Sequence, residues 1–419
     1  MGRTMKDSGL PWIGQIPSNW RCLRGKYALR YLQKSTKEDD GVITCFRDGE
    51  VTLRSNRREE GFTISEKEIG YQGIDVGDLV VHGMDGFAGS IGISDSRGKA
   101  SPVLVVLDSN ENKRFLMYYL RNLAYRDVFL ALATGIRVRS CDLRWNKIAE
   151  TVFVLPPIDE QSRIVSFIDN KLSEIDAAIS EAQALIDKYK SFKQSVIFEA
   201  VTKGLDPHVP MKDSGVEWIG EIPEHWKLSR MDVLFSEGTQ KNIFYEFDHA
   251  MKFTYGELVP KNEEGDISEL KGTYLAYSVI EENDIAINGL NLNFDFVSQR
   301  VARCPKRGIL TSAYLILKPN DKRYSRYFTY QLKSWDNQKV FHGMGKGVRL
   351  TLSFSEVKKM LMPIPTFEEQ QSIAEYLDDK CMQIDSIISE KEQLISRLQE
   401  YKKSIIFEYV TGKKEVTNG

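Results

Sequence analysis

The sequence is poor in the residues that build disulfide frameworks and metal centres. Its 419 residues include only five cysteines and five histidines. The cysteines are odd in number, lie far apart and form no C-x-x-C pair, so neither a disulfide framework nor a zinc site is expected. The histidines have no metal-ligand spacing either. We therefore predict no metal site in this chain.

Long apolar runs are also missing. No stretch approaches the roughly 18 consecutive apolar residues that suggest a membrane span, and the segment from Met1 to Lys6 lacks the apolar region of a signal peptide. Hydrophobic residues nevertheless make up 42% of the chain, enough to bury substantial cores. We expect a cytoplasmic protein with no membrane association, and a length that suits about two to four domains.

Catalytic motifs are absent as well. The Pro156-Pro157 pair is flanked by Leu155 and Ile158, so it does not form the [DN]PP[YF] loop of a methyltransferase. The glycine-rich segment 343–347 lacks the GxxxxGK[ST] spacing that cradles phosphates. No pattern pairs a nucleophile with a base. The sequence therefore favours a binding protein over an enzyme.

The chain does contain a long internal repeat. MKDSGLPWIGQIPSNW at 5–20 returns as MKDSGVEWIGEIPEHW at 211–226, 206 residues later. At the same offset GDLVV (77–81) matches NDIAI (283–287), and both read as short strands after a turn. Later matches drift: SPVLVVL (101–107) pairs with TSAYLIL (311–317) at an offset of 210. A unit of about 205 residues is written twice, a period too long for a solenoid.

Each copy ends in an apolar pattern with the 4, 3 spacing of a coiled-coil heptad. The first seam comprises Ile168, Leu172, Ile175, Ile179, Ala182, Ile186, Tyr189, Lys193, Val196 and Ala200. Adding 209 to each number gives the second seam: Leu377, Cys381, Ile384, Ile388, Lys391, Ile395, Leu398, Lys402, Ile405 and Tyr409. Stripes of this length need burial, and the first helix leads from one globular domain to the other. We therefore expect the helices to pair antiparallel, the alternative being two unrelated helices, each packed into its own domain.

The predicted fold is a tandem duplication of α/β (α+β) domains joined by two long antiparallel α-helices. The segments are a first globular domain at 1–155, a first helical region at 156–204, a second globular domain at 205–362 and a second helical region at 363–419. An antiparallel pair would place Gly419 near Met1 and give a pseudo-twofold, nearly circular arrangement.

The distribution of charge indicates where a polyanion could bind. Lys and Arg total 23 against 19 acids in 1–155 and 21 against 21 in 205–362, whereas the helical segments are acidic, at 6 against 8 and 7 against 11. Nucleic acid should therefore meet the globular domains. Their cations occur in four clusters: Arg47, Arg54, Arg57 and Arg58; Arg137, Arg139 and Arg144; Arg300, Arg303, Lys306 and Arg307; Lys339, Lys346 and Arg349. For each of these residues, DNA contact stands beside the alternative of ordinary solvated surface charge.

In the order of its motifs, the chain resembles the specificity subunits of type I restriction-modification systems. The resemblance rests on the duplicated WIG-x-IP-x-x-W segments, the strands that follow GD or ND, and the P-x(2,3)-EQ start of each long helix (PIDEQ at 157–161; PTFEEQ at 365–370). It covers essentially the whole chain. It implies two target recognition domains, 1–155 and 205–362, that each read one half of a split DNA sequence.

The resemblance also implies partners. Such subunits bind double-stranded DNA and hold two methyltransferase subunits, to which translocase and nuclease subunits are added for restriction. No cofactor is expected in this chain; S-adenosylmethionine, ATP and Mg²⁺ would be bound by the partner subunits. Base-reading residues are expected at 31–74 and 237–280, where the copies do not align, and in the loops after the GD and ND strands. A coiled-coil adaptor that binds no DNA and a standalone DNA-modifying enzyme remain alternatives.

The paired helices are expected to set the distance between the two half-sites. Deleting one heptad from each helix, 178–184 together with 387–393, keeps both seams in register. It should shorten each helix by about 10 Å, or about 3 base pairs of DNA. Methylation mapping of the assembled complex should then show the same half-sites with a shorter gap.

An unchanged gap in that experiment would mean that the spacing is set elsewhere. Deletion of 178–184 alone is the control, because it misaligns the seams and should lower stability.

Overall fold

The structure, a computed structural model, describes residues 3–57, 68–131, 143–261, 267–292, 295–342, 344 and 351–416. The chain forms two compact units. Unit 1 comprises Met1–Gln183 with Gln393–Gly419, and unit 2 comprises Ala184–Glu392. Each long helix therefore contributes one part to each unit.

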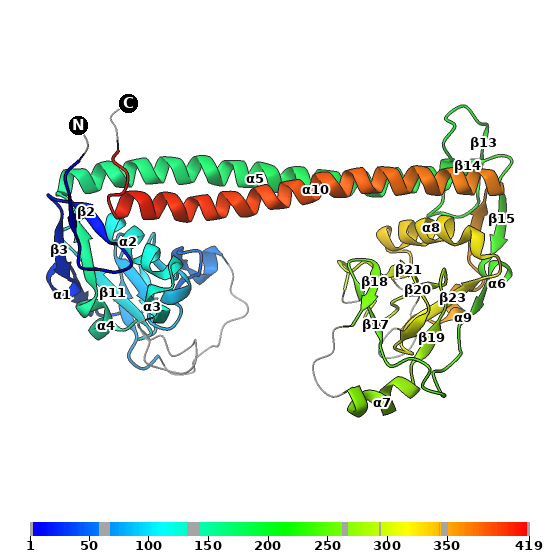
Figure 1. Cartoon of the computed structure of the whole chain (residues 1–419), viewed down its shortest axis with the longest axis horizontal. Coiled ribbons are helices and arrows are strands. Elements are labelled where there is room, and N and C mark those ends of the chain that lie inside the picture. The colour runs from blue at the N-terminus through cyan, green and yellow to red at the C-terminus, as the bar shows by residue number, and fades with distance from the viewer. Residues whose placement is uncertain are drawn as a thin grey trace. The chain divides into compact units, whose positions relative to one another are not determined.

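A four-stranded antiparallel sheet, in the order β4-β11-β8-β9, forms the centre of unit 1 (Figure 1). Its strands are β4 (Arg30–Leu32), β8 (Leu79–His82), β9 (Ile91–Ile93) and β11 (Leu104–Asp108). Leu79 and Val81 pack into the core beneath helix α2 (Lys113–Tyr125), whereas Val80 faces a second core on the opposite side of the sheet. Because both faces are covered, the central strands read as continuous apolar runs.

The remaining strands of unit 1 form two-stranded antiparallel pairs. These pairs are β1 (Met5–Asp7) with β2 (Gln15–Pro17), β3 (Arg21–Arg24) with β12 (Val152–Leu155), β5 (Ile43–Cys45) with β6 (Val51–Leu53), and β7 (Gln72–Ile74) with β10 (Gly98–Ala100). The short helical elements are α1 (Gly25–Ala28), η1 (Arg54–Asn56), η2 (Gly86–Ala88), α3 (Val128–Ala131) and α4 (Trp145–Glu150).

Unit 2 repeats this plan with the sheet order β16-β23-β20-β21. The sheet strands are β16 (Phe235–Glu237), β20 (Ile285–Ile287), β21 (Val301–Arg303) and β23 (Leu315–Pro319). The two-stranded pairs are β13 (Met211–Asp213) with β14 (Glu221–Pro223), β15 (Lys227–Arg230) with β24 (Leu361–Ile364), β17 (Met251–Thr254) with β18 (Glu257–Pro260), and β19 (Ser278–Ile280) with β22 (Gly308–Leu310). The helical elements are α6 (Met231–Leu234), α7 (Ile267–Leu275), η4 (Lys322–Tyr324), α8 (Ser325–Asn337) and α9 (Phe354–Val357).

Strand register confirms the sequence alignment of the two copies. Val80 lies opposite Val106 in unit 1, and Ala286 lies opposite Ile316 in unit 2. These pairs reproduce the offsets of 206 and 210 that the sequence showed.

The duplicated GD or ND dipeptide closes the turn before the central strand. Gly77 and Asn283 both have a positive φ, 85° and 69°, which glycine and asparagine tolerate best. The following aspartate then caps the turn: Asp78 accepts a hydrogen bond from the Asp75 backbone at 2.8 Å, and Asp284 accepts one from the Glu281 backbone at 3.0 Å. The motif is therefore a turn signal.

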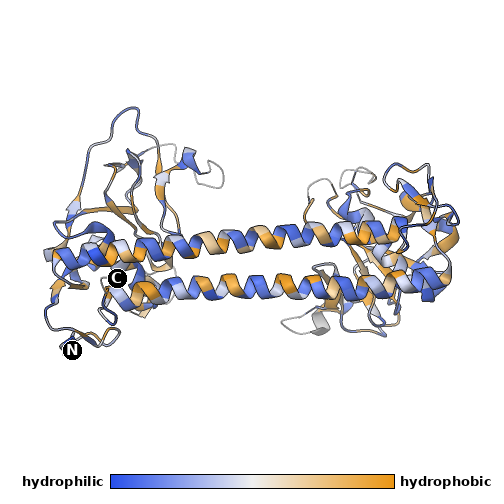
Figure 2. Cartoon of the chain, turned by 90° about the horizontal axis from the view of Figure 1, so that it is seen from above, coloured by the Kyte–Doolittle hydropathy of each residue, from blue (hydrophilic) through white to orange (hydrophobic). Residues whose placement is uncertain are grey.

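The two long helices are α5 (Ile158–Lys203) and α10 (Phe367–Val410). Figure 2 shows apolar and polar residues alternating along both. None of the residues in the two predicted seams is exposed, whereas nearly all their neighbours between 172 and 196 are.

Contacts within each unit establish the direction of the helix pair. In unit 1 the start of α5 packs on the end of α10: the rings of Phe167 and Tyr409 lie 4.4 Å apart, and Lys402 pairs with Asp176 at 2.5 Å (Figure 1). In unit 2 the end of α5 meets the start of α10, where Lys193 pairs with Asp385 at 2.6 Å. The helices are antiparallel, and the predicted fold class is confirmed.

The opening motif of each copy is bonded to the start of the long helix that ends that copy. Trp20 donates its indole N–H to Glu160, and Trp226 does the same to Glu369, both at 3.2 Å. The glutamines that follow, Gln161 and Gln370, donate to the carbonyls of Pro156 and Pro365 at 2.9 and 3.0 Å. The tryptophan and the glutamate of each EQ pair are thus repeated in the sequence because they bond to each other, and the glutamine because it bonds to the proline segment before the helix.

The end of the chain packs on its own beginning within unit 1. Lys413 donates to the carbonyl of Gln15 at 2.7 Å. Gly412 has a φ of +70°, and a Cβ there would lie only 2.4 Å from Pro17. In unit 2 the end of α5 makes the equivalent approach, with Gly204 against Trp226. Residues 412–413 therefore pack on residues 15–17, whereas Met1 and Gly419, which were expected to lie near each other, fall outside the described residues.

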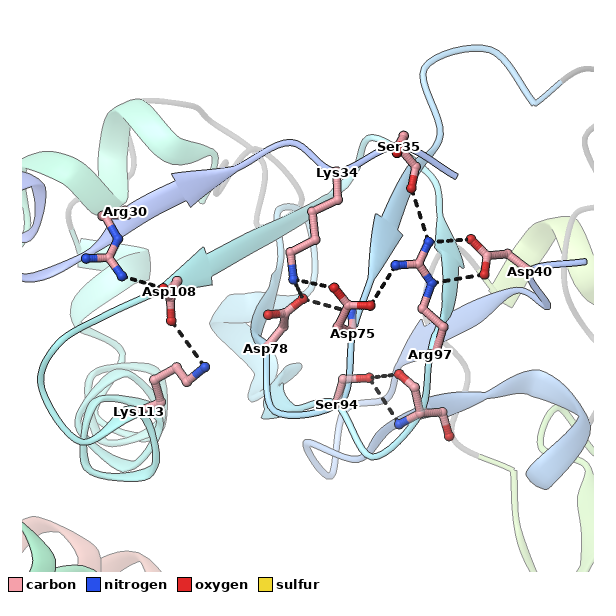
Figure 3. A network of polar contacts seen from close by, with 11 residues as sticks. Arg30, Lys34, Ser35, Asp40, Asp75, Asp78, Ser94, Arg97, Asp108 and Lys113 are labelled. Carbon is pink, nitrogen blue, oxygen red and sulfur yellow. Dashed lines mark hydrogen bonds and ion pairs between the residues drawn. The ribbon is translucent and has the colours of Figure 1, made fainter. Parts of the chain in front are cut away.

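A network of ion pairs ties three loops of unit 1 together (Figure 3). Arg97 binds both oxygens of the buried Asp40 at 3.0 and 2.9 Å, and it binds Asp75 at 2.6 Å. Lys34 bridges Asp75 and Asp78 at 2.8 and 2.6 Å. Hydrogen bonds from Lys34 and Arg97 lower the pKa of Asp75 to about 2, and Arg97 also lowers the pKa of Asp40.

Removal of Arg97 should therefore destabilise unit 1. Arg97→Ala leaves the Asp40 carboxylate buried without its cation, and we expect the free energy of unfolding to fall by about 2 to 4 kcal/mol at pH 7. Because the native carboxyl pKa values are depressed, this stabilisation is complete above about pH 4 and is lost as the pH falls toward 2. The difference between wild type and variant should shrink over that window in urea unfolding.

The matched control is Arg24→Ala, which removes an exposed pair with Glu150 and should change the unfolding free energy by less than about 1 kcal/mol. Equal effects of the two substitutions would contradict a structural role for the network.

Candidate nucleic-acid interface

The segments that do not align in sequence fold into hairpins at the same place in both units. In unit 1, Val42 forms a parallel bridge to Lys99 and leads into the hairpin β5–β6. In unit 2, Ala250 forms a parallel bridge to Ile309 and leads into the hairpin β17–β18. The two units therefore share one frame, by which we mean the four-stranded sheet, the two-stranded pairs and the long helices, and they differ in the surfaces of their hairpins.

The unit 1 hairpin borders a groove of about 1060 Å³, which gathers three of the predicted cations. Arg47 follows β5, while Arg54 and Arg57 follow β6. The other side of the groove is formed by His82 at the end of β8, by the turn that follows it and by residues 101–104. The lining residues are Ile43, Thr44, Cys45, Phe46, Arg47, Asp48, Arg54, Arg57, His82, Met84, Asp85, Ser90, Ser101, Val103 and Leu104.

The three arginines differ in how firmly they are held. Arg57 lies over the ring of Phe46 at 4.2 Å and pairs with Asp48 at 2.6 Å and Glu50 at 2.8 Å. These bonds raise its pKa. The Nε of Arg54 donates to Thr44 at 3.0 Å. Arg47 pairs with Asp85 at 3.0 Å, and 71% of its side chain is exposed.

His82 lines the same groove, and sequence analysis did not identify it. Its Nδ1 accepts hydrogen bonds from the backbone N–H groups of Met84 and Asp85, at 3.3 and 3.0 Å. Burial lowers the pKa of His82. The charge of Arg47 lowers this pKa further, whereas the charge of Asp85 raises it. The ring is therefore neutral at pH 7 and carries its proton on Nε2. Its position directly after the GD strand was the available signal.

In unit 2, Arg300 is a correction to the predicted DNA contacts. Its side chain is fully buried, and its guanidinium donates to the carbonyls of Asn288, Leu290 and Asp295 at 3.0, 2.6 and 2.7 Å. It holds the loop after β20 against β21 and does not reach the surface. The sequence placed Arg300 in a cluster of cations next to β21, but the backbone carbonyls of this loop accept hydrogen bonds from its guanidinium and hold it inside the unit.

The other members of this cluster lie at the surface. Arg303 is exposed and donates to the Asn283 side chain at 2.7 Å, and Lys306 is exposed in the turn before β22. Arg307 is held by Glu281 at 2.9 Å and Glu246 at 3.3 Å. Arg303 and Lys306 remain candidate DNA contacts, and Arg307 resembles Arg57 in being paired with two carboxylates.

A second, smaller cleft in unit 2 brings Arg303 together with cations that sequence analysis did not single out. It measures about 350 Å³, and its lining includes Arg326 and Lys333 of α8. Arg326 and Lys333 belong to the polar positions of an amphipathic helix, and nothing in the sequence indicates that they lie close to Arg303.

Five predicted contacts, Arg58, Arg137, Arg139, Lys346 and Arg349, lie outside the described residues. Among the residues that are described, no group of three or more histidine, cysteine or acidic side chains could hold a metal ion. Within the same residues, no helix is both long and apolar enough to cross a membrane.

Comparison with known proteins agrees with the motif-based resemblance. No protein-family profile matches the chain. The chain is 23% identical over 429 residues to the putative type I restriction enzyme MjaX specificity subunit of Methanocaldococcus jannaschii, covering 96% of both chains. It is 24% identical over 363 residues to the type I restriction enzyme EcoBI specificity subunit of Escherichia coli, covering 80% of this chain and 73% of the relative.

Solved structures show the same fold. One comes from work on complex assembly and conformational transition of the type I R-M system; it has a TM-score of 0.71 at 14% identity, covering 95% of this chain and 99% of the other. Another is the HsdS subunit from Thermoanaerobacter tengcongensis, with a TM-score of 0.51 at 14% identity, covering 95% and 98%. The predicted resemblance to type I specificity subunits is confirmed.

The cations of the unit 2 cluster should separate into two classes on substitution. Arg300→Ala removes the buried donor of the Asn288, Leu290 and Asp295 carbonyls and should lower the free energy of unfolding by about 2 to 4 kcal/mol. The double variant Arg303→Ala with Lys306→Ala should change it by less than about 0.5 kcal/mol. Urea unfolding measures both.

In a DNA-binding assay of the assembled complex, only the double variant should weaken binding while the protein stays folded. Unchanged DNA binding by the double variant would assign these two cations to solvated surface charge.

Proposed function

We infer that this chain is the DNA sequence-recognition subunit of a type I restriction-modification system and has no catalytic activity of its own. The observation that carries this inference is the duplication of one frame that presents two different hairpin surfaces. Turn, tryptophan and helix-start contacts are the same in both units, while the hairpins differ in strand length and in the length of the connecting loop, 46–50 in one and 255–256 in the other. Such a design suits the reading of two different short sequences.

We propose that the target is bipartite, with one half-site read by each unit. A β-ribbon fits the major groove, where the edges of all four base pairs are distinguishable. The hairpins β5–β6 and β17–β18 are two-stranded ribbons, and the cations that line or flank them supply the donors.

We further propose that two identical methyltransferase subunits bind this chain and that restriction subunits join through them. The duplicated contacts between helices support two equivalent docking surfaces. Tyr118 of α2 donates to Asp169 of α5 at 2.5 Å, and Tyr330 of α8 donates to Asp378 of α10 at 2.6 Å. In this proposal the partner subunits bind S-adenosylmethionine, ATP and Mg²⁺.

The isolated chain should bind DNA weakly, and addition of the methyltransferase subunit should produce specific binding with a steep salt dependence. The formal charges of the two globular segments, +4 for 1–155 and 0 for 205–362, are small beside the several phosphate contacts of tight DNA binders. Fluorescence anisotropy at several salt concentrations, with DNA carrying the mapped methylation site and with scrambled DNA, measures both properties.

Tight, sequence-specific binding by the chain alone would contradict this prediction. A complex that shows no sequence preference at any salt concentration would contradict the proposed function itself.

A further inference from the structure

We propose that the groove of unit 1 reads a G·C base pair, with Arg47 as the guanine-contacting residue and the Nε2–H of His82 as a second donor. This inference rests on the proposed function and assigns the residues that determine sequence at one half-site. The groove combines a hairpin on one side with the turn after β8 on the other, and both named residues line it.

Arg47 is the most exposed of the three arginines that line the groove, since Arg54 is half-buried and the side chain of Arg57 is 37% exposed. The fork of Arg57 is occupied by Asp48 and Glu50, and its guanidinium is stacked on Phe46. Arg57 therefore acts as a positioning residue that fixes the hairpin. Arg47 keeps 71% of its side chain exposed and contacts the half-exposed Asp85 through one ion pair. An exposed pair of this kind is weak and opens readily.

The neighbouring carboxylate favours a base over a phosphate as the partner of Arg47. Asp85 lies 3.0 Å from the guanidinium, so a phosphate placed there would meet a like charge. The edge of a guanine presents two neutral acceptors, N7 and O6, that match the arginine fork. Asp85 can in turn accept from the N4 amino group of the paired cytosine.

His82 is fixed as a donor by its own turn. Because its Nδ1 accepts from the backbone at Met84 and Asp85, only Nε2 is left for a ligand, and it carries the proton. The guanidinium of Arg47 and the Nε2–H of His82 are thus two hydrogen-bond donors in one groove, and they favour a base edge that presents acceptors. The equivalent position in unit 2 is Asn288, whose Oδ1 accepts from the Leu290 backbone at 3.1 Å. Asparagine therefore preserves this type of turn and lacks the ring N–H.

The experiment uses the chain assembled with its methyltransferase subunit. After the methylated sequence is mapped, competition binding is measured with duplexes in which each base pair of both half-sites is replaced in turn. Arg47→Ala should reduce discrimination at one G·C pair about 10- to 100-fold, with no change in the other half-site. Arg47→Gln should shift the preference at that pair toward A·T, since glutamine pairs with adenine.

His82→Asn should fold normally and reduce discrimination at the same pair or at its neighbour. The matched control is Arg24→Ala, an exposed arginine with a single carboxylate partner that does not line the groove. It should leave every position unchanged.

Two results would overturn the inference. An equal loss of affinity at all positions in Arg47→Ala, with a shallower salt dependence, would make Arg47 a phosphate contact. Unchanged discrimination in both Arg47 variants would make it surface charge. Either result leaves the proposed function intact, which falls only if the wild-type complex itself fails to discriminate.

Discussion

The burial of one apolar stripe on each long helix is the constraint on which the rest of the fold depends. A single helix of this length, with polar residues on its remaining faces, has too little apolar contact to be stable alone. In unit 1 the stripe is buried by the end of α10, and in unit 2 by the start of α10. Unit 1 therefore includes Gln393–Gly419, a segment that lies far away in the sequence, and unit 2 begins with the last part of α5, a helix that starts in the first copy. Ile405 and Val410 belong to the core of unit 1, and Ile197 and Val201 belong to the core of unit 2.

The same constraint explains which residues the two copies share. The tryptophan of the opening motif and the glutamate at the helix start hold the long helix to its own unit. The tyrosine–aspartate bonds from α2 to α5 and from α8 to α10 hold it again a few turns later. Because these bonds come from the opening motif, α2 and α8, they leave the sequences of the hairpins free to differ. The residues that bond to the long helices are therefore the same in both units, and the surfaces of the hairpins differ.

The carboxylates next to each arginine decide whether its guanidinium is held within the protein or is free to bind a ligand. Arg57, Arg97 and Arg307 are each held by two acids and organise loops. Arg300 is buried against backbone carbonyls. Of the clustered cations that the structure describes, Arg57, Arg300 and Arg307 are thus engaged within the protein, in keeping with the near-neutral total of 57 basic and 59 acidic residues. Recognition by few, well-placed donors suits a subunit that binds DNA together with partners.

The sequence by itself determined the duplication, the register of the strands and the antiparallel helix pair, because periodic apolar patterns and repeated motifs record local geometry directly. It also located the hairpins, as the stretch where the copies stop matching. It did not separate Arg47 from Arg57 or Arg300, and it did not identify His82. Whether an arginine faces solvent, a carboxylate or a ring of carbonyls depends on residues that are distant in sequence. Only the tertiary structure brings Asp85 to Arg47 and the loop after β20 to Arg300, and these contacts decide which cations are available for binding.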